Sequence, residues 1–184
     1  LAILEACRRW NPGVRIVFAS TRQIYGRPRY LPVDETHPLD PVDVNGINKI
    51  AGEMYHLLYA KVYGLQATSL RLTNTYGPRM RIKDARQTFL GVWVRRLLEG
   101  QPITVFGDGT QVRDFTYVDD AVAALLVAAT TAQTVGGAYN LDADERVTLG
   151  ELAALLIECH GGGTCEYIPF PPDRKAIDIG DYYA

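Results

Sequence analysis

The sequence predicts an α/β protein built around a doubly wound parallel β-sheet. Two observations carry this prediction. Short apolar, β-rich runs alternate with longer segments that have the apolar spacing of helices. The run at 14–19, the helical pattern at 41–63 and the run at 67–72 form one strand–helix–strand unit. Strands joined in this way lie parallel, with helices covering the faces of the sheet.

The remaining elements follow from local signals along the chain. A helix over 1–10 ends at the turn formed by Asn11, Pro12 and Gly13, and four prolines predict a surface loop at 25–41. The helix at 41–63 has a regular apolar stripe and ends before Gly64. A capping box of Thr148 and Glu151 starts the helix that runs to 159. The other predicted helices are 84–98 and 119–130, and the other predicted strands are 103–106, 112–118, 137–141 and 166–168.

Composition excludes several classes of protein. The 184 residues are 47% hydrophobic and 22% charged, as in globular chains, and the net charge is −2. We expect no nucleic-acid or membrane partner, because there is no basic excess and no apolar stretch of roughly 20 residues. The three cysteines, Cys7, Cys159 and Cys165, suit neither a disulfide framework nor a common zinc site. We therefore expect no metal, and a cytoplasmic, reducing location.

Four segments carry polar side chains at or near predicted strand ends, where open α/β sheets bind ligands. They are 20–26 (STRQIYG), 45–49 (NGINK), 71–79 (RLTNTYGPR) and 103–120 (ITVFGDGTQVRDFTYVDD). Arg113 could bind a phosphate through two hydrogen bonds, and a surface ion pair with Asp108 or Asp114 is the plainer alternative. Taken singly, the segment at 20–26 is better explained as a strand-to-loop turn, and Lys49 in the second segment as a solvated lysine on an amphipathic helix.

Taken in order, the four segments resemble the extended short-chain dehydrogenase/reductases, specifically the NAD-dependent sugar-nucleotide epimerase/dehydratase family of the UDP-glucose 4-epimerase type. The shared patterns are a Ser/Thr segment ending in Tyr-Gly, then Lys-x-x-Gly-Glu, Arg-x-x-Asn-x-Tyr-Gly-Pro, and Phe-Gly-Asp-Gly before Arg-Asp-Phe. The resemblance covers nearly the whole chain. It implies a partial Rossmann-like sheet with a small C-terminal α/β substrate-binding lobe. Residues 1–78 would be the C-terminal half of the NAD-binding domain, and 79–184 mostly the sugar-nucleotide lobe, interleaved with the first and truncated at its end.

The resemblance also implies roles for matching residues. Thr21 stands at the catalytic Ser/Thr position, which hydrogen-bonds the reacting sugar hydroxyl. Lys49 matches the lysine that holds the nicotinamide ribose. Cofactor contacts are expected at Ser20, Lys49 and Leu72, and substrate contacts at Asn74, Phe106, Arg113 and Lys175.

One departure from the family pattern concerns the catalytic base. Asn45 occupies the position of the family tyrosine, four residues before Lys49. An amide has no accessible pKa and cannot act as a general base. Tyr25, Tyr76 and His37 are nearby alternatives, although packing beside a glycine turn is the better explanation for each tyrosine.

Two further departures concern the cofactor site and the reaction class. The sequence contains no glycine-rich pyrophosphate motif and starts at Leu1 inside a helical pattern, so we expect a piece of a longer enzyme that is inactive by itself. Arg22 and Gln23 replace the Asp-Glu pair of the related dehydratases, and Gln23 replaces the glutamate of the decarboxylases. Epimerase-like or reductase-like chemistry on a nucleotide-linked hexose remains.

The resulting hypothesis is part of an NAD-dependent nucleotide-sugar epimerase, which removes a hydride from a sugar carbon and returns it to the other face. The alternatives are a non-catalytic nucleotide-sugar-binding relative, because of Asn45, and an inactive fragment. The resemblance further implies a homodimer that packs through the helices at 1–10 and 41–63.

Overall fold

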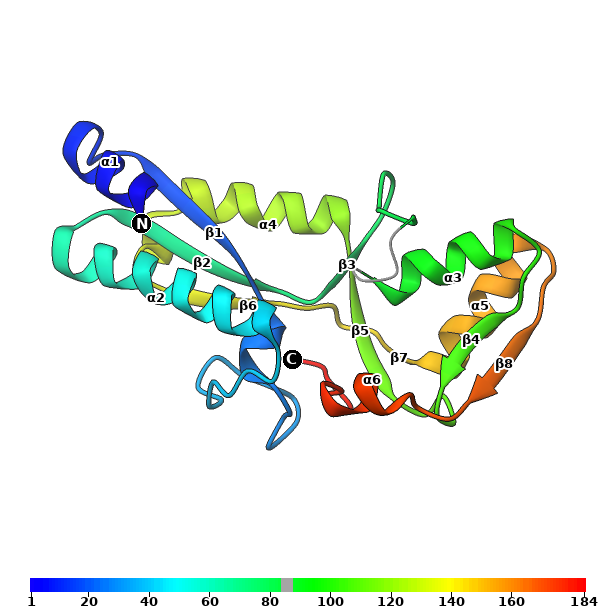
Figure 1. Ribbon diagram of the computed structural model, residues 1–184. Helices are drawn as coiled ribbons and strands as arrows, with labels where there is room; N and C mark the ends of the chain where they lie inside the picture. The colour runs from blue at the N-terminus through cyan, green and yellow to red at the C-terminus, as the bar shows by residue number, and fades with distance from the viewer. Residues whose placement is uncertain (84–87) are drawn as a thin grey trace.

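A three-stranded parallel sheet organises the larger lobe of the molecule (Figure 1). The structure is a computed structural model that describes residues 1–83 and 88–184. The strands, in spatial order, are β1 (Arg15–Thr21), β2 (Gln66–Leu72) and β6 (Ala138–Leu141). The helices around them are α1 (Ala2–Trp10), α2 (Val44–Tyr63) and α4 (Val118–Thr130). α2 and α4 cover opposite faces of β1 and β2, which confirms the doubly wound parallel arrangement (Figure 1).

A smaller lobe lies at one end of this sheet (Figure 1). Its strands are β3 (Asn74–Tyr76), β4 (Ile103–Phe106), β5 (Val112–Tyr117), β7 (Arg146–Thr148) and β8 (Cys165–Ile168), and its larger helices are α3 (Phe89–Leu98) and α5 (Leu149–His160). β5 pairs in parallel with β3 and antiparallel with β7, and β4 pairs in parallel with β8. α3 and α5 pack on β4 around a buried core that includes Trp93, Ile103 and Val105.

Side-chain caps fix where the main helices begin. Asp43 accepts a hydrogen bond from the Gly46 amide, so α2 starts at Val44 rather than at the predicted residue 41. Thr148 and Glu151 form the predicted capping box of α5. The predicted helix at 84–98 is seen from Phe89 onward, and its positions 84–87 lie outside the described residues.

Several short elements carried no recognisable sequence signal. They are the strands β3 and β7, the 3₁₀ turns η1 (Arg22–Tyr25) and η2 (Ala132–Thr134), and the helix α6 (Pro172–Ala176). The prediction that 25–41 lies over the surface was wrong in part, because Tyr25, Val33 and His37 are buried. The C-terminal tail packs on this loop, where Tyr182 is fully buried and the Tyr183 carbonyl accepts from the Val33 amide.

The two faces of α2 are unusual for an amphipathic helix. The predicted apolar stripe points outward, where Ile47, Met54, Leu58 and Val62 are each at least half exposed. The inner face instead presents small and polar residues to β1. A Cβ on Gly52 would stand 2.6 Å from the Phe18 ring, so a glycine there lets the helix approach the strand closely.

The structure also bears on membrane association. Within the described ranges, no helix combines the length and the apolar character that a membrane crossing requires.

Candidate functional site

The carboxyl ends of β1 and β2 bring the predicted cofactor and catalytic residues together. The parallel register places Thr21 beside Leu72 and Ser20 beside Arg71. Lys49 reaches this edge from α2, and its ammonium donates a hydrogen bond to the Ala19 carbonyl at 2.6 Å. Ser20, Thr21, Lys49 and Leu72 therefore form one group, which we call the strand-end group.

Asn45 lies one helical turn before Lys49 and belongs to a chain of polar side chains. Its amide nitrogen donates to Gln23 Oε1, and Gln23 Nε2 donates to Asp43 Oδ2 at 2.8 Å. Asn45 is exposed, so a ligand at the strand-end group could reach it. The chain supplies hydrogen-bond donors and acceptors but, at Asn45 itself, no group that titrates.

The structure argues against Tyr25 and His37 as replacement bases. The Tyr25 hydroxyl accepts from Arg71 Nη1 at 2.6 Å and donates to Asn140 Oδ1 at 2.7 Å, and burial raises its pKa. Both ring nitrogens of His37 are occupied by backbone groups, at 2.8 and 2.9 Å. Tyr76 is exposed and packs on aromatic residues of β5. Tyr25 and His37 are thus held in structural hydrogen bonds.

A buried ion pair explains two of the family-like motifs. Glu53 accepts from Arg71 Nη2 at 2.6 Å and from Arg71 Nε at 3.1 Å, and Ser69 adds a hydrogen bond at 2.8 Å. Burial by itself would raise the pKa of Glu53, but the Arg71 bonds outweigh it and the pKa is lowered. The Glu of Lys-x-x-Gly-Glu and the Arg of Arg-x-x-Asn therefore join α2 to β2.

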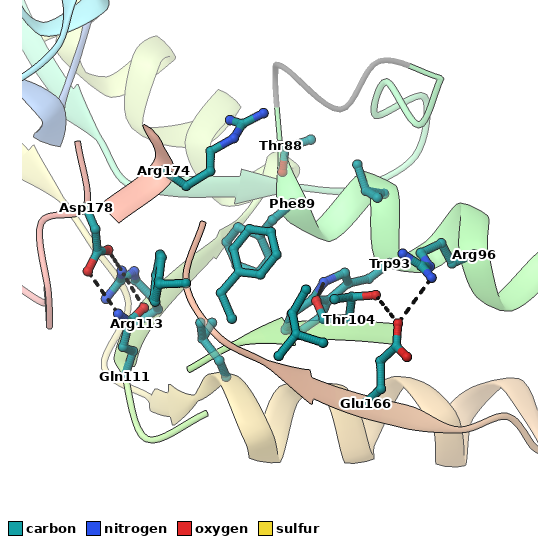
Figure 2. Close-up of a pocket in the computed structure, with 15 residues that line it drawn as sticks. Thr88, Phe89, Trp93, Arg96, Thr104, Gln111, Arg113, Glu166, Arg174 and Asp178 are labelled. Carbon is teal, nitrogen blue, oxygen red and sulfur yellow. Dashed lines mark hydrogen bonds and ion pairs between the residues drawn. The ribbon is translucent and has the colours of Figure 1, made fainter. Parts of the chain in front are cut away.

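A cavity of about 540 Å³ opens in the smaller lobe (Figure 2). Its lining includes four aromatic side chains, two of which, Phe106 and Phe170, stand with their ring centres 5.5 Å apart. Arg113 and Arg174 line one side. At the other end Thr104 donates to Glu166 at 2.8 Å, beside Arg96 (Figure 2). An aromatic wall with two guanidinium groups suits a base or ring joined to an anionic group.

Arg113 is buried and is held by the C-terminal tail. Its guanidinium lies 3.7 Å from Asp178 and donates to the backbone carbonyls of Val112 and Gly180. Burial, together with the charge of Arg22, lowers its pKa to about 10, so it remains charged at neutral pH. The alternative of a surface ion pair with Asp108 or Asp114 is replaced by a pair with Asp178, which the tail brings to this side chain.

The structure places the second predicted cation differently. Lys175 lines a separate shallow hollow with Arg27 and Asp181, whereas its neighbour Arg174 lines the main cavity. Both residues belong to α6, which starts with Pro172 at its first turn. Recognising that short helix would have shown that consecutive residues point to different sides.

Asn74 connects the strand-end group to the cavity. Its side-chain oxygen accepts from Arg22 Nη2 at 3.1 Å, and its amide donates to the Asp114 carbonyl at 2.9 Å, next to Arg113. Arg22 also stacks on Tyr182, with its guanidinium carbon 5.0 Å from the ring centre. In the sequence Arg22 stands out only as a departure from the dehydratase pattern, and no local signal shows that it lies between the two halves of the site.

The described residues include no group of three or more His, Cys, Asp or Glu side chains that could hold a metal ion.

Comparisons with known proteins bear on this arrangement. The model of the NAD dependent epimerase/dehydratase family matches residues 1–142. Over 127 residues the chain is 42% identical to a protein of Methanocaldococcus jannaschii that is named as a UDP-glucose 4-epimerase, covering 68% of this chain and 41% of that protein.

Two solved structures share the fold over almost the whole chain. The Thermotoga maritima UDP-glucose 4-epimerase with UDP-glucose has a TM-score of 0.85 at 32% identity, covering 98% of this chain and 58% of that one. The Bacillus cereus UDP-glucuronic acid 4-epimerase with UDP-glucuronic acid and NAD has a TM-score of 0.82 at 28% identity, covering 98% and 55%.

The chain spans about half the length of the relatives it matches. The family match extends over most of the chain, from α1 to β6, and includes the strand-end group, Asn74 and Arg113. The chain belongs to the NAD-dependent epimerase/dehydratase family.

Proposed function

We propose that this chain is part of an NAD-dependent nucleotide-sugar epimerase, which removes a hydride from a sugar carbon and returns it to the opposite face. The observation that carries the proposal is the continuity of the site. The strand-end group with Thr21 and Lys49 is joined through Arg22 and Asn74 to the cavity with Arg113. A ligand long enough to reach both would place a sugar between them.

The strand-end group fits the nicotinamide ribose of NAD by its chemistry. An ammonium group has three donors, so Lys49 can contact a ribose hydroxyl while it keeps its bond to Ala19. Leu72 adds an apolar side chain at the neighbouring strand end, whereas the Ser20 hydroxyl is buried and shielded from solvent, so the expected contact at Ser20 is limited to its backbone. When bound, NAD supplies the acceptor and then the donor of the hydride. The role of these residues is to orient the nicotinamide against the sugar.

The cavity fits the nucleotide part of the substrate. Phe106 and Phe170 offer aromatic faces to a base, and Arg113 and Arg174 offer guanidinium groups to a diphosphate. We propose a UDP-sugar, because UDP-sugars occur in the names of several relatives. Thr21 would hydrogen-bond the reacting hydroxyl, and the remote contacts would supply the binding energy that positions it.

Asn45 favours a second candidate function, a nucleotide-sugar-binding protein without turnover. The residue stands one turn before Lys49, and its amide cannot take the proton that leaves the sugar hydroxyl. Tyr25 and His37 are occupied by structural hydrogen bonds. The pocket would then be retained while the base is absent.

Calorimetric titration with UDP and UDP-glucose tests the binding part of the proposal. We expect binding to the unmodified chain, and we expect Arg113→Gln to weaken UDP binding by roughly tenfold or more. Arg29→Gln is the matched control, since Arg29 is exposed and 3.8 Å from Asp40. If UDP and UDP-glucose both fail to bind, or if the two variants behave alike, the proposal is wrong.

Interconversion of UDP-glucose and UDP-galactose in the presence of NAD separates the two functions. Turnover by the unmodified chain supports the epimerase. Turnover that arises only in Asn45→Tyr supports the binding protein that has lost its base, because the tyrosine would stand one turn from Lys49. Binding without turnover in either protein is the outcome expected of the third alternative, a piece of an enzyme that is inactive by itself.

We also propose a homodimer through α1 and α2. The outward stripe of α2 is an apolar surface on a long helix. α1 is in contact with α2, and its Ile3 is 74% exposed. Light scattering after size exclusion should give twice the monomer mass. Leu58→Glu should give a monomer, whereas Leu126→Glu, on the similarly exposed face of α4, should leave the mass unchanged. Equal effects of the two variants would contradict this interface.

Two other expectations remain proposals. We propose that residues 1–78 and 79–184 divide into cofactor and substrate regions, with β6 returning to the first sheet. We propose a cytoplasmic location, which the three free cysteines support because such thiols persist in a reducing compartment.

A further inference from the structure

Arg22 is a half-buried cation whose hydrogen-bonding capacity is only partly used. It follows Thr21 directly, in the turn η1 after β1. Nη2 donates to Asn74 and the guanidinium stacks on Tyr182. Nη1 is shielded from solvent, and among the residues that the structure describes it has no hydrogen-bond partner. A buried guanidinium donor without an acceptor is costly, so an acceptor from outside the chain would stabilise it.

The negative charges around Arg22 compensate it only from a distance. No carboxylate lies within 4.0 Å of Arg22 in the described parts of the chain, and Asp114, Asp43 and Asp178 act on it only from farther away. Asp114 is itself fully buried, its carboxylate oxygens have no side-chain hydrogen-bond partner among the described residues, and burial raises its pKa to about 6. Asp178 is committed to Arg113. Burial lowers the pKa of Arg22, and the attraction of Asp114, which would raise it, is too weak to offset that effect. This is expected for an incompletely compensated cation.

The position of Arg22 places such an anion at the sugar. On one side stands Thr21, which the proposed function puts at the reacting hydroxyl. On the other side stands Arg113, whose pKa is lowered in part by the nearby charge of Arg22. Asn74 touches both Arg22 and the backbone beside Arg113. The part of a nucleotide sugar that lies between the reacting carbon and the diphosphate is the hexose ring with its substituents.

We propose that Arg22 is a specificity-determining residue that selects a sugar with a carboxylate, a nucleotide-linked hexuronate, over the neutral hexose. A guanidinium donates strong charge-assisted hydrogen bonds to a carboxylate, and Nη1 is the donor that remains. A neutral hydroxymethyl group would leave the cation without its counter-charge. This inference rests on the proposed nucleotide-sugar function and names its substrate class.

The test compares three ligands by calorimetric titration of the full chain: UDP, UDP-glucose and UDP-glucuronate. The unmodified chain should bind UDP-glucuronate roughly ten- to a hundredfold more tightly than UDP-glucose, as expected for a charged hydrogen bond. Arg22→Gln should remove that preference and leave UDP binding unchanged. Arg22→Lys should restore part of the preference, and Arg29→Gln should keep all of it.

Each outcome bears on a different claim. Equal binding of the two sugars by the unmodified chain would overturn this inference while leaving the proposed function intact. A parallel loss of UDP and UDP-glucuronate binding in Arg22→Gln would show that Arg22 holds the diphosphate, which also overturns it. Circular dichroism serves as the check that each variant is folded. If none of the three ligands binds the unmodified chain, the proposed function fails and takes this inference with it.

Discussion

Replacing Glu53 with glutamine should destabilise the fold strongly, because it breaks a buried ion pair. Glu53 is 1% exposed and Arg71 is 5% exposed, and two guanidinium nitrogens of Arg71 contact the carboxylate. Glu53→Gln leaves that guanidinium buried without its counter-charge, which costs about 3–5 kcal/mol. For a chain of this size each kcal/mol lowers Tm by about 2–4 °C, so we expect a fall of about 6–20 °C.

Thermal unfolding followed by circular dichroism measures this effect. Glu99→Gln is the control, because Glu99 is half exposed and its 4.0 Å pair with Arg95 should contribute less than about 1 kcal/mol. The pKa of Glu53 lies below its ordinary 4.5, so its stabilisation is present above that pH and is lost as the pH falls further. The difference between wild type and Glu53→Gln should therefore shrink as the pH falls below 4.5. Similar Tm values for the two variants at neutral pH would refute the reasoning.

Three other changes have expected outcomes. Gly52→Ala should lower the free energy of unfolding by about 1–3 kcal/mol in urea titrations, because the new Cβ meets Phe18. An unchanged urea midpoint would contradict this, because it would show that α2 can move away from β1 without cost. Thr148→Ala should lower the free energy of unfolding by about 1 kcal/mol, because it removes the capping box with Glu151. Thr148→Ser should recover most of that loss. Equal free energies of unfolding for the wild type and Thr148→Ala would contradict the cap. Asp114 has its pKa raised to about 6, so it favours the folded state below pH 4 and loses that contribution as the pH rises through 6. Asp114→Asn should thus gain stability relative to wild type between pH 4 and 7 in urea titrations, and a constant difference would contradict the raised pKa.

The large elements of the fold could be predicted because their signals are local. The strand at 14–19, the helix ending at Gly64 and the capping box at Thr148 are each specified by neighbouring residues. The short strands β3 and β7 depend instead on pairing with β5, which no local pattern encodes. The outward orientation of the α2 stripe also escaped prediction, because periodicity identifies an apolar face without saying what covers it.

The candidate site was predictable to a similar extent. Family-like motifs indicated Thr21, Lys49, Asn74 and Arg113, and the structure gathers them along one continuous path. The partners of those residues come from distant parts of the chain. Asp178 reaches Arg113 across 65 positions, and that contact exists only because the tail folds back.

The pairing of Arg113 with the tail has a thermodynamic consequence for ligand binding. Asp178 already compensates the charge of Arg113, with the Gly180 carbonyl beside it. A diphosphate that approaches Arg113 must then exchange with a carboxylate, rather than add to an uncompensated cation. Part of the Coulomb attraction is offset by the broken pair, so salt should weaken binding less than the charges of the ligand suggest. The displaced tail would lose contacts in the same event, which couples affinity at the cavity to order in the last residues of the chain.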